Sequence, residues 1–198
     1  MNYIVYDLEL NSKPFKSHIP NEIIEIGAVK LNDNLQKLDS FSSFVKPRRF
    51  NKLFPIVKRK TKISQDDIDN APGFKAVINN FIRWVGDDYV LISWGHDDIH
   101  HLFSNCKYHK VRIGWLKKNV DIQKQFSAIF NMPSNQRYSL ENALCAMELK
   151  MGENLHRALN DAEYTAQIFT AIFNKIDLTV FNSVKTKRKH KNQKNSQT

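Results

Sequence analysis

The sequence predicts a single α/β domain with a mixed central sheet flanked by helices, and three observations support this prediction. Apolar segments rich in β-branched residues come first, at residues 3–8, 22–31 and 41–45, and indicate three strands. A fourth such segment, at residues 89–94, lies between segments of helical periodicity. The remainder of the chain is helical, which is an order typical of α/β proteins. A length of 198 residues suits one domain and leaves no room for two large ones.

Helices are expected where apolar residues recur at spacings of three and four. Residues 74–85 follow this pattern and end before Gly86, and glycine commonly follows a helix. Further helices are expected over residues 97–106 and 121–130, and another begins at Ser139. The apolar face of a long last helix is traced by Leu159, Ala162, Ala166, Phe169, Phe173 and Ile176.

Two segments lack a clean hydrophobic period. Residues 46–72 contain prolines and many cations, so we expect a long loop with one turn of helix. Residues 185–198 have almost no apolar content, which is typical of disorder. The expected organisation is therefore one folded domain over residues 1–180, followed by a basic, disordered tail over residues 181–198.

Composition excludes several classes of protein. Apolar residues make up 41% and charged residues 25% of the chain, which argues against a coiled coil or a fully disordered protein. No apolar run reaches the roughly 18 residues of a membrane span, and we expect no secretory signal. Cys106 and Cys145 lie far apart, which excludes a zinc finger and a disulfide framework and fits a reducing cytoplasm. The six glycines are too dispersed for a dinucleotide or P-loop motif.

The net charge of +10 is concentrated in two patches. Residues 46–62 hold eight basic residues and residues 185–194 hold six, with no acid in either patch. The remainder has 16 basic against 20 acidic residues, so the body is mildly acidic. Such patches suit a polyanionic partner. The second patch is either a tether for that partner or inert, and we favour the tether.

Carboxylates stand at two positions where a strand of the sheet would end. Asp7 and Glu9 are two apart on the first strand and share one face, so they meet solvent, cations or a metal ion. Asp97 and Asp98 follow the buried fourth strand, where acids also cap helices. Adjacent helical residues diverge by about 100°, so only one of these two can face the same site as Asp7.

His156 and Asp161 flank the start of the last helix. We expect His156 in the preceding loop, above a site, and Asp161 in the first turns. A lone histidine at a helix start is more often structural than functional, so this pair alone does not identify a site.

Taken together, these fragments resemble the signature of the DEDDh 3′–5′ exonuclease superfamily, whose fold is RNase H-like. The match comprises Asp-x-Glu at residues 7–9, Asp-Ile-x-x-Leu at residues 98–102 and His-x4-Asp at residues 156–161, in order and spacing. It runs from about residue 2 to residue 173 and includes residues 22–28. Ser-Trp-Gly at residues 93–95 is similar to the branch of RNA-trimming exonucleases and bacterial KapD-like proteins. One departure is Lys62, where the family often has glycine between threonine and isoleucine, so substrate contacts in that loop are expected to differ.

The resemblance implies a metal-dependent phosphodiesterase. Asp7, Glu9 and Asp161 would hold one divalent ion, Asp7 would bridge to a second, and Asp98 would assist the second through water. Two ions about 3.5–4 Å apart activate water and relieve charge on the phosphate. Carboxylates suit Mg²⁺ or Mn²⁺, and the sequence leaves the choice open. His156 would be the general base, since an ordinary histidine pKa of about 6.5 lies near working pH.

The expected substrate is single-stranded nucleic acid, with RNA favoured over DNA, and the expected products are nucleoside 5′-monophosphates. Candidate substrate contacts are Leu10, Phe50, Phe54 and Trp94. Leu10 could equally be a residue of the hydrophobic core. The two phenylalanines could stack on bases, or they could simply anchor the basic loop to the protein. The alternatives are a non-catalytic nucleic-acid-binding or adaptor module on the same fold, and a DNA-directed proofreading-type exonuclease. The sequence leaves the oligomeric state open.

Overall fold

The structure is a computed structural model that describes residues 1–133, 135–150, 152 and 155–182. The tail expected from residue 181 onward therefore lies outside the described residues, apart from its first two. Of these, Asn182 donates from its backbone nitrogen to the carbonyl oxygen of Asn119 at 2.8 Å. No helix in the described part of the chain has the length and apolar character needed to cross a bilayer.

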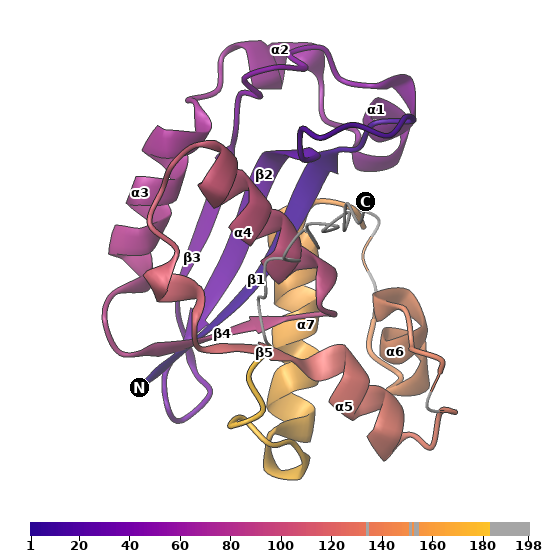
Figure 1. Ribbon diagram of the computed structural model, residues 1–198. Coiled ribbons are helices and arrows are strands. Elements are labelled where there is room, and N and C mark those ends of the chain that lie inside the picture. Colours follow the sequence, from indigo (N-terminus) through magenta and orange to yellow (C-terminus); the bar gives the residue numbers. More distant parts are fainter. Residues whose placement is uncertain (134, 151, 153–154, 183–198) are drawn as a thin grey trace, which may run out of the picture.

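A five-stranded mixed sheet forms the centre of the molecule, as the sequence predicts (Figure 1). The strands lie in the order β3-β2-β1-β4-β5. β1 is antiparallel to β2 and parallel to β4; β2 is also antiparallel to β3, and β4 is parallel to β5. Their bounds are β1 Asn2–Asn11, β2 Glu22–Leu31, β3 Lys37–Phe44, β4 Tyr89–Ser93 and β5 Asn119–Asp121.

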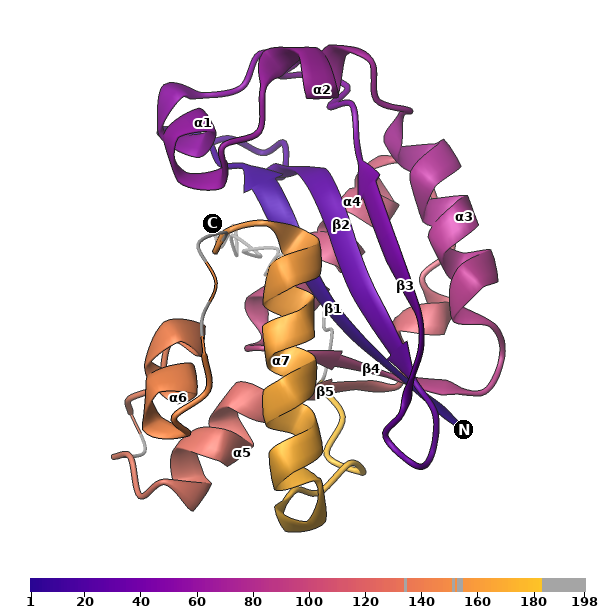
Figure 2. The same cartoon turned by 180° about the vertical axis from the view of Figure 1, so that it is seen from behind.

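Helices cover both faces of this sheet. α3 (Phe74–Val85) and α4 (Asp97–Tyr108) lie on one face, and α7 (Ala158–Ile172) lies on the other (Figure 2). α5 (Ile122–Ile129) and α6 (Leu140–Ala146) pack beside α7. Two short 3₁₀ segments complete the described chain, η1 at Gly114–Leu116 and η2 at Phe173–Lys175.

The alternation of β1 separates the two halves of the core. Ile4, Tyr6 and Leu8 pack with α3 and α4, whereas Tyr3 and Val5 pack with α7. Successive strand side chains point to opposite faces, so the next odd-numbered positions, Asp7 and Glu9, continue the face that α7 covers. The strand period thus directs both acids of the first motif toward the last helix.

Two parts of the chain differ from the sequence-based expectation. Residues 46–72 contain two short helices, α1 (Pro55–Thr61) and α2 (Gln65–Asp69), rather than a loop with one turn. α1 begins with proline at its first turn, and α2 has a capping box in which Ser64 and Asp67 bond reciprocally. β5 is a strand that the sequence does not reveal, because three residues are too few for a periodic pattern.

Candidate active site

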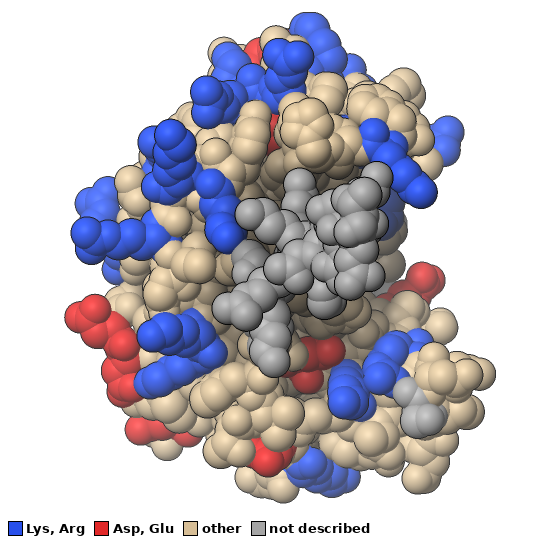
Figure 3. Space-filling model, viewed as in Figure 1, with Lys and Arg blue, Asp and Glu red and all other residues tan. Residues whose placement is uncertain are grey.

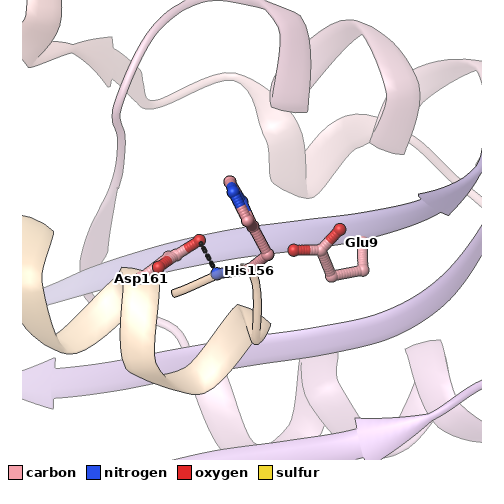
Figure 4. Close-up of side chains that lie close together, drawn as sticks. All are labelled: Glu9, His156 and Asp161. Atoms are coloured by element: carbon pink, nitrogen blue, oxygen red, sulfur yellow. Dashed lines mark hydrogen bonds between the residues drawn. The ribbon is translucent and has the colours of Figure 1, made fainter. Parts of the chain in front are cut away.

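Three residues from two motifs meet where β1 passes the start of α7. Glu9, His156 and Asp161 each offer one ligand atom, and these atoms lie within 4.8 Å of one another. In Figure 4 the carboxylate of Glu9 reaches from β1 toward the turn that carries His156. Within the described residues this is the only group of three or more such side chains with that geometry.

The turn before α7 fixes His156 relative to Asp161. His156 has a positive φ of 67°, a conformation that is uncommon for a residue with a side chain. Its backbone N–H donates to Oδ2 of Asp161 at 3.2 Å (Figure 4). The other oxygen, Oδ1, is buried and has no hydrogen-bond partner in the described part of the chain. A buried carboxylate oxygen without a partner is costly, and a cation would satisfy it.

Asp98, in the first turn of α4, lies near enough to Asp7 and Asp161 to interact with them electrostatically. The turn between β4 and α4 is closed by Gly95, whose φ is 100°, and its N–H donates to Asp121 Oδ1 at 3.1 Å. Ser93 Oγ donates to the Gly95 carbonyl at 2.8 Å. This turn leaves Asp97 exposed and Asp98 partly buried. The sequence could not choose between the two neighbours by geometry, and their exposure favours Asp98.

Burial, together with neighbouring negative charges, raises the pKa values of all four acids. The pKa of Asp7 lies well above its ordinary value because the group is removed from water and because Asp98, Asp161 and Glu9 are near. Burial and neighbouring acids raise the pKa of Glu9 to about 8 and that of Asp98 to about 8. Burial raises the pKa of Asp161 to about 6, although the hydrogen bond from the His156 N–H and the charge of Lys60 oppose the shift. Such mutual repulsion would be relieved by bound cations.

The donor set fits divalent cations of the Mg²⁺ class. Carboxylate oxygens are the ligands that Mg²⁺ and Mn²⁺ prefer. Asp7 and Asp98 lie close enough to interact electrostatically, but they do not join the three-residue group defined by Glu9, His156 and Asp161. The geometry also offers His156 as a ligand, whereas the sequence-based assignment makes it a base. The pKa of His156 is lowered by burial and by Lys60, which favours its neutral form.

Contacts between β2 and α7 hold the site together. The residues of β2 that make them belong to the family match, but the sequence did not indicate what they contact. Glu25 is 1% exposed and accepts from the guanidinium of Arg157 at 2.9–3.3 Å. It also accepts from the backbone N–H of Ala158 at 3.2 Å. At Gly27 the backbone of β2 touches α7 so closely that any side chain would collide with Ala158. Both residues belong to the matched segment at residues 22–28.

A pocket of about 290 Å³ adjoins the acidic cluster. Glu9 and Leu10 line it from β1, and Ile56 and Lys60 line it from α1. Leu10 also packs partly against the core beneath α3 and α4, so both interpretations of this residue have a structural counterpart. Lys60 was not singled out by the sequence, yet its charge acts on all three clustered residues.

Two buried polar side chains anchor the basic segment, residues 46–62, beside this pocket. The carboxylate of Glu22 accepts from the three backbone N–H groups of residues 48–50 at 2.6–3.2 Å. The amide of Asn11 donates to two carbonyl oxygens and accepts one N–H within residues 50–54, at 2.9–3.0 Å. The basic segment is therefore fixed to the ends of β1 and β2.

Phe50 and Phe54 belong to an aromatic cluster with a third member that the sequence did not indicate. Phe15 lies edge-on to both, with ring centroids 5.8 and 6.0 Å away, and is 51% exposed. The ammonium of Lys13 lies 5.7 Å from the ring centroid of Phe50. Phe50 and Phe54 are only partly exposed, so Phe15 offers the most accessible ring of the three.

Trp94 makes internal contacts. Its indole N–H donates to the Tyr138 carbonyl at 3.2 Å, and its ring lies edge-on to Phe126 at 5.3 Å. These contacts attach the end of β4 to α5. They account for a tryptophan at this position without any contact to a substrate. A role in substrate binding stays a sequence-based prediction.

Comparisons with known proteins agree with this architecture. The nuclease domain of 3′hExo, described as a DEDDh family member bound to rAMP, superimposes with a TM-score of 0.81 at 24% identity over 92% of this chain and 96% of that one. A PolC-type DNA polymerase III from Clostridium perfringens is 31% identical over 88% of this chain, which spans 11% of the polymerase. The probable 3′–5′ exonuclease KapD of Bacillus subtilis is 30% identical over 55% of this chain and 53% of KapD.

The structural likeness shows the RNase H-like fold, and KapD is among the relatives, as the resemblance implied. The chain spans about a tenth of the PolC-type polymerases and about half of KapD. The model of the RNase_T exonuclease family matches residues 4–169, which include every acid of the cluster and His156. This chain therefore belongs to the RNase_T exonuclease family.

Proposed function

We propose that this protein is a metal-dependent 3′–5′ exonuclease that hydrolyses single-stranded nucleic acid to nucleoside 5′-monophosphates. The observation that carries the proposal is the cluster of Glu9, His156 and Asp161, whose ligand atoms lie within 4.8 Å of one another and in which the buried Oδ1 of Asp161 has no hydrogen-bond partner among the described residues. Asp7 and Asp98 complete a set of four acids whose charges need compensation. An inactive module would have no reason to retain this set.

The residues divide into ion holders and a base. Asp7, Glu9 and Asp161 would hold one divalent ion, with Asp7 and Asp98 facing a second. Bound there, the ions would lower the pKa of a water molecule and neutralise charge on the phosphate. His156 accepts the proton of the attacking water, for which its lowered pKa keeps it neutral near pH 7. The new bond joins water oxygen to phosphorus, the bond to the 3′ oxygen of the preceding nucleotide breaks, and that oxygen takes a proton from solvent to become the new 3′ hydroxyl.

Single-stranded substrate is favoured by what surrounds the cluster. The pocket beside Glu9 is lined by apolar side chains and Lys60, and the exposed ring of Phe15 lies close by on Phe54. A base can stack on such a ring only when it is unpaired, and the cation can then contact the adjoining phosphates. Duplex ends would have to fray before entering.

RNA is the substrate that we favour, because of the Ser-Trp-Gly approach to Asp98 and because the structurally similar 3′hExo nuclease domain is bound to rAMP. A DNA-directed, proofreading-type exonuclease is the second candidate. The specific observation in its favour is the 31% identity to PolC-type polymerases over 88% of this chain.

One experiment distinguishes an RNA-directed exonuclease from a DNA-directed exonuclease and from a non-catalytic binding module. The full chain is incubated with 5′-labelled RNA and DNA strands of one sequence, with Mg²⁺, Mn²⁺ or chelator, and the products are sized. The proposal expects a ladder that shortens from the 3′ end, no cleavage in chelator, and resistance of a circular strand. Equal cleavage of circles would indicate an endonuclease. Faster cleavage of DNA would favour the proofreading-type alternative, and no cleavage under any condition would favour the binding module.

A further inference from the structure

A second basic surface lies along the outer side of α3, and none of the residues of the acidic cluster lines it. It consists of two adjoining pockets of about 460 and 930 Å³ that share Lys75. We call it the α3 basic surface and define it by its five cations, which are Lys46, Arg48, Lys75, Lys110 and Arg112.

In the described part of the chain, carboxylates do not pair with these cations at close range, although Lys46 lies near enough to Asp69 to act on it electrostatically. No carboxylate lines either pocket, and none of the five cations forms an ion pair within the described ranges. Lys46 Nζ donates to a carbonyl oxygen, that of Asp69, at 2.6 Å. The Arg48 guanidinium lies 5.9 Å from the ring centroid of Tyr108. Figure 3 shows Lys and Arg side chains gathered over the α3 side and the upper end of this face. The surface therefore carries net positive charge.

Apolar side chains alternate with the cations in the larger pocket. Ile82 from α3 and Val111, Ile113 and Trp115 from the segment after α4 line it, and Ile113 is 36% exposed. In the smaller pocket the ring of His109 stacks on Phe74 at 4.7 Å. A mixture of unpaired cations and apolar surface suits a strand that presents phosphates together with sugars and bases. A small anion would instead need convergent donors in a more enclosed site.

The α3 basic surface is continuous in sequence with the rim of the acidic cluster. Lys46 and Arg48 open the basic segment, and Lys60 near its other end lines the pocket beside Glu9. We infer that the α3 basic surface binds the backbone of the substrate strand upstream of its 3′ end. The inference rests on the proposed function and adds a second contact region, outside the site of cleavage, for strands long enough to reach it.

The test compares short and long strands. Fluorescence anisotropy in chelator would measure binding of 5′-labelled oligouridylates of about 5 and about 20 nucleotides, lengths that bracket the roughly 4–16 nucleotides of common single-strand sites. The variant is Lys75→Glu with Arg112→Glu in the full chain. Lys124→Glu with Lys175→Glu, which changes exposed lysines of α5 and η2 by the same charge, is the matched control.

We expect the Lys75/Arg112 variant to lose affinity for the long strand only. Two lost phosphate contacts should lower the slope of log affinity against log salt by about 1.4, at roughly 0.7 per contact. Binding and Mg²⁺-dependent cleavage of the short strand should match the control variant. Lys75→Gln with Arg112→Gln should show a smaller loss in the same direction, and circular dichroism would verify folding of every variant.

Equal long-strand affinity and slope in the two charge-reversal variants would overturn the inference, as would an equal loss for short and long strands. Failure of the proposed function looks different. In that case no oligonucleotide is cleaved by the unmodified chain, whatever the binding data show. Length-dependent binding that requires Lys75 and Arg112 would then still establish the surface.

Discussion

Gly27 of β2 lies against the backbone of Ala158, so that a Cβ added to the glycine would be 2.5 Å from the Ala158 carbonyl oxygen. The close approach sets the distance between the sheet and the first turn of α7. That turn carries Asp161, and the residue before its N-cap is His156. The absence of one side chain on β2 therefore helps to place two candidate site residues.

Gly27→Ala should displace the start of α7 and lower both stability and activity. The clash is with backbone atoms, which cannot rotate away, so we expect a loss of about 1–3 kcal/mol, as for overpacked cores. Denaturant unfolding and a cleavage assay would measure the two effects. Gly73→Ala is the control, because a Cβ there meets no atom within 4 Å. Unchanged activity in Gly27→Ala would show that the site tolerates a shift of α7.

His156→Ala should lower the rate of cleavage by about 10²–10⁴, the usual worth of a positioned acid–base group. If His156 is a base, metal affinity measured by calorimetry should change little. If it is a ligand, as its place beside Glu9 and Asp161 also permits, affinity should fall with the rate. Because burial lowers its pKa, the acidic limb of the wild-type pH–rate profile should fall below pH 6.5 and should vanish in the variant.

The metal-free protein should lose stability as pH rises from about 4 to about 8. Glu9 and Asp98, with pKa values near 8 in the folded state and about 4 when unfolded, bind more protons folded than unfolded in this window. Stability therefore falls with increasing pH, and it is fully retained only below the unfolded pKa. Melting curves in chelator at several pH values would measure the effect.

Asp98→Asn should remove part of this pH dependence, raise the melting temperature in chelator near pH 8 and abolish cleavage. Asp97→Asn should leave cleavage largely intact, because Asp97 is exposed, and should change the pH dependence less than Asp98→Asn, since it removes only one charge that raises the pKa of Asp98. The reverse order of the two variants would show that Asp97 is the acid that faces the site. A flat melting temperature across the pH range would contradict the assigned burial of the cluster.

Phe15→Ala should weaken binding of single strands by about 1–3 kcal/mol if one base stacks on this ring. Its exposure and its contacts with Phe50 and Phe54 make it the accessible member of the aromatic cluster. Anisotropy with a labelled strand in chelator would measure the loss. Phe181→Ala, which truncates another exposed phenylalanine, should leave affinity unchanged. Similar affinities for both variants would leave the cluster with an anchoring role alone.

The sequence predicted the sheet, the main helices and the family because those depend on periodicity and motif spacing. The strand period alone directed Asp7 and Glu9 to one face, and the structure gives that face its partner, α7. Phe15 and Lys60 were not foreseen, because each is an ordinary loop or helix residue whose place near the site depends on folding of residues 46–62. The function of Gly27 was equally hidden, since its neighbour lies more than a hundred residues away.

The attachment of the basic segment by Glu22 and Asn11 has a consequence for the thermodynamics of binding. The backbone amides of residues 48–50 and 54 are already hydrogen-bonded before any ligand arrives. Association therefore orders side chains rather than main chain, and such preorganisation lowers its entropic cost. Strand capture by this segment should behave as docking onto a rigid body, with a small heat-capacity change and no coupled folding.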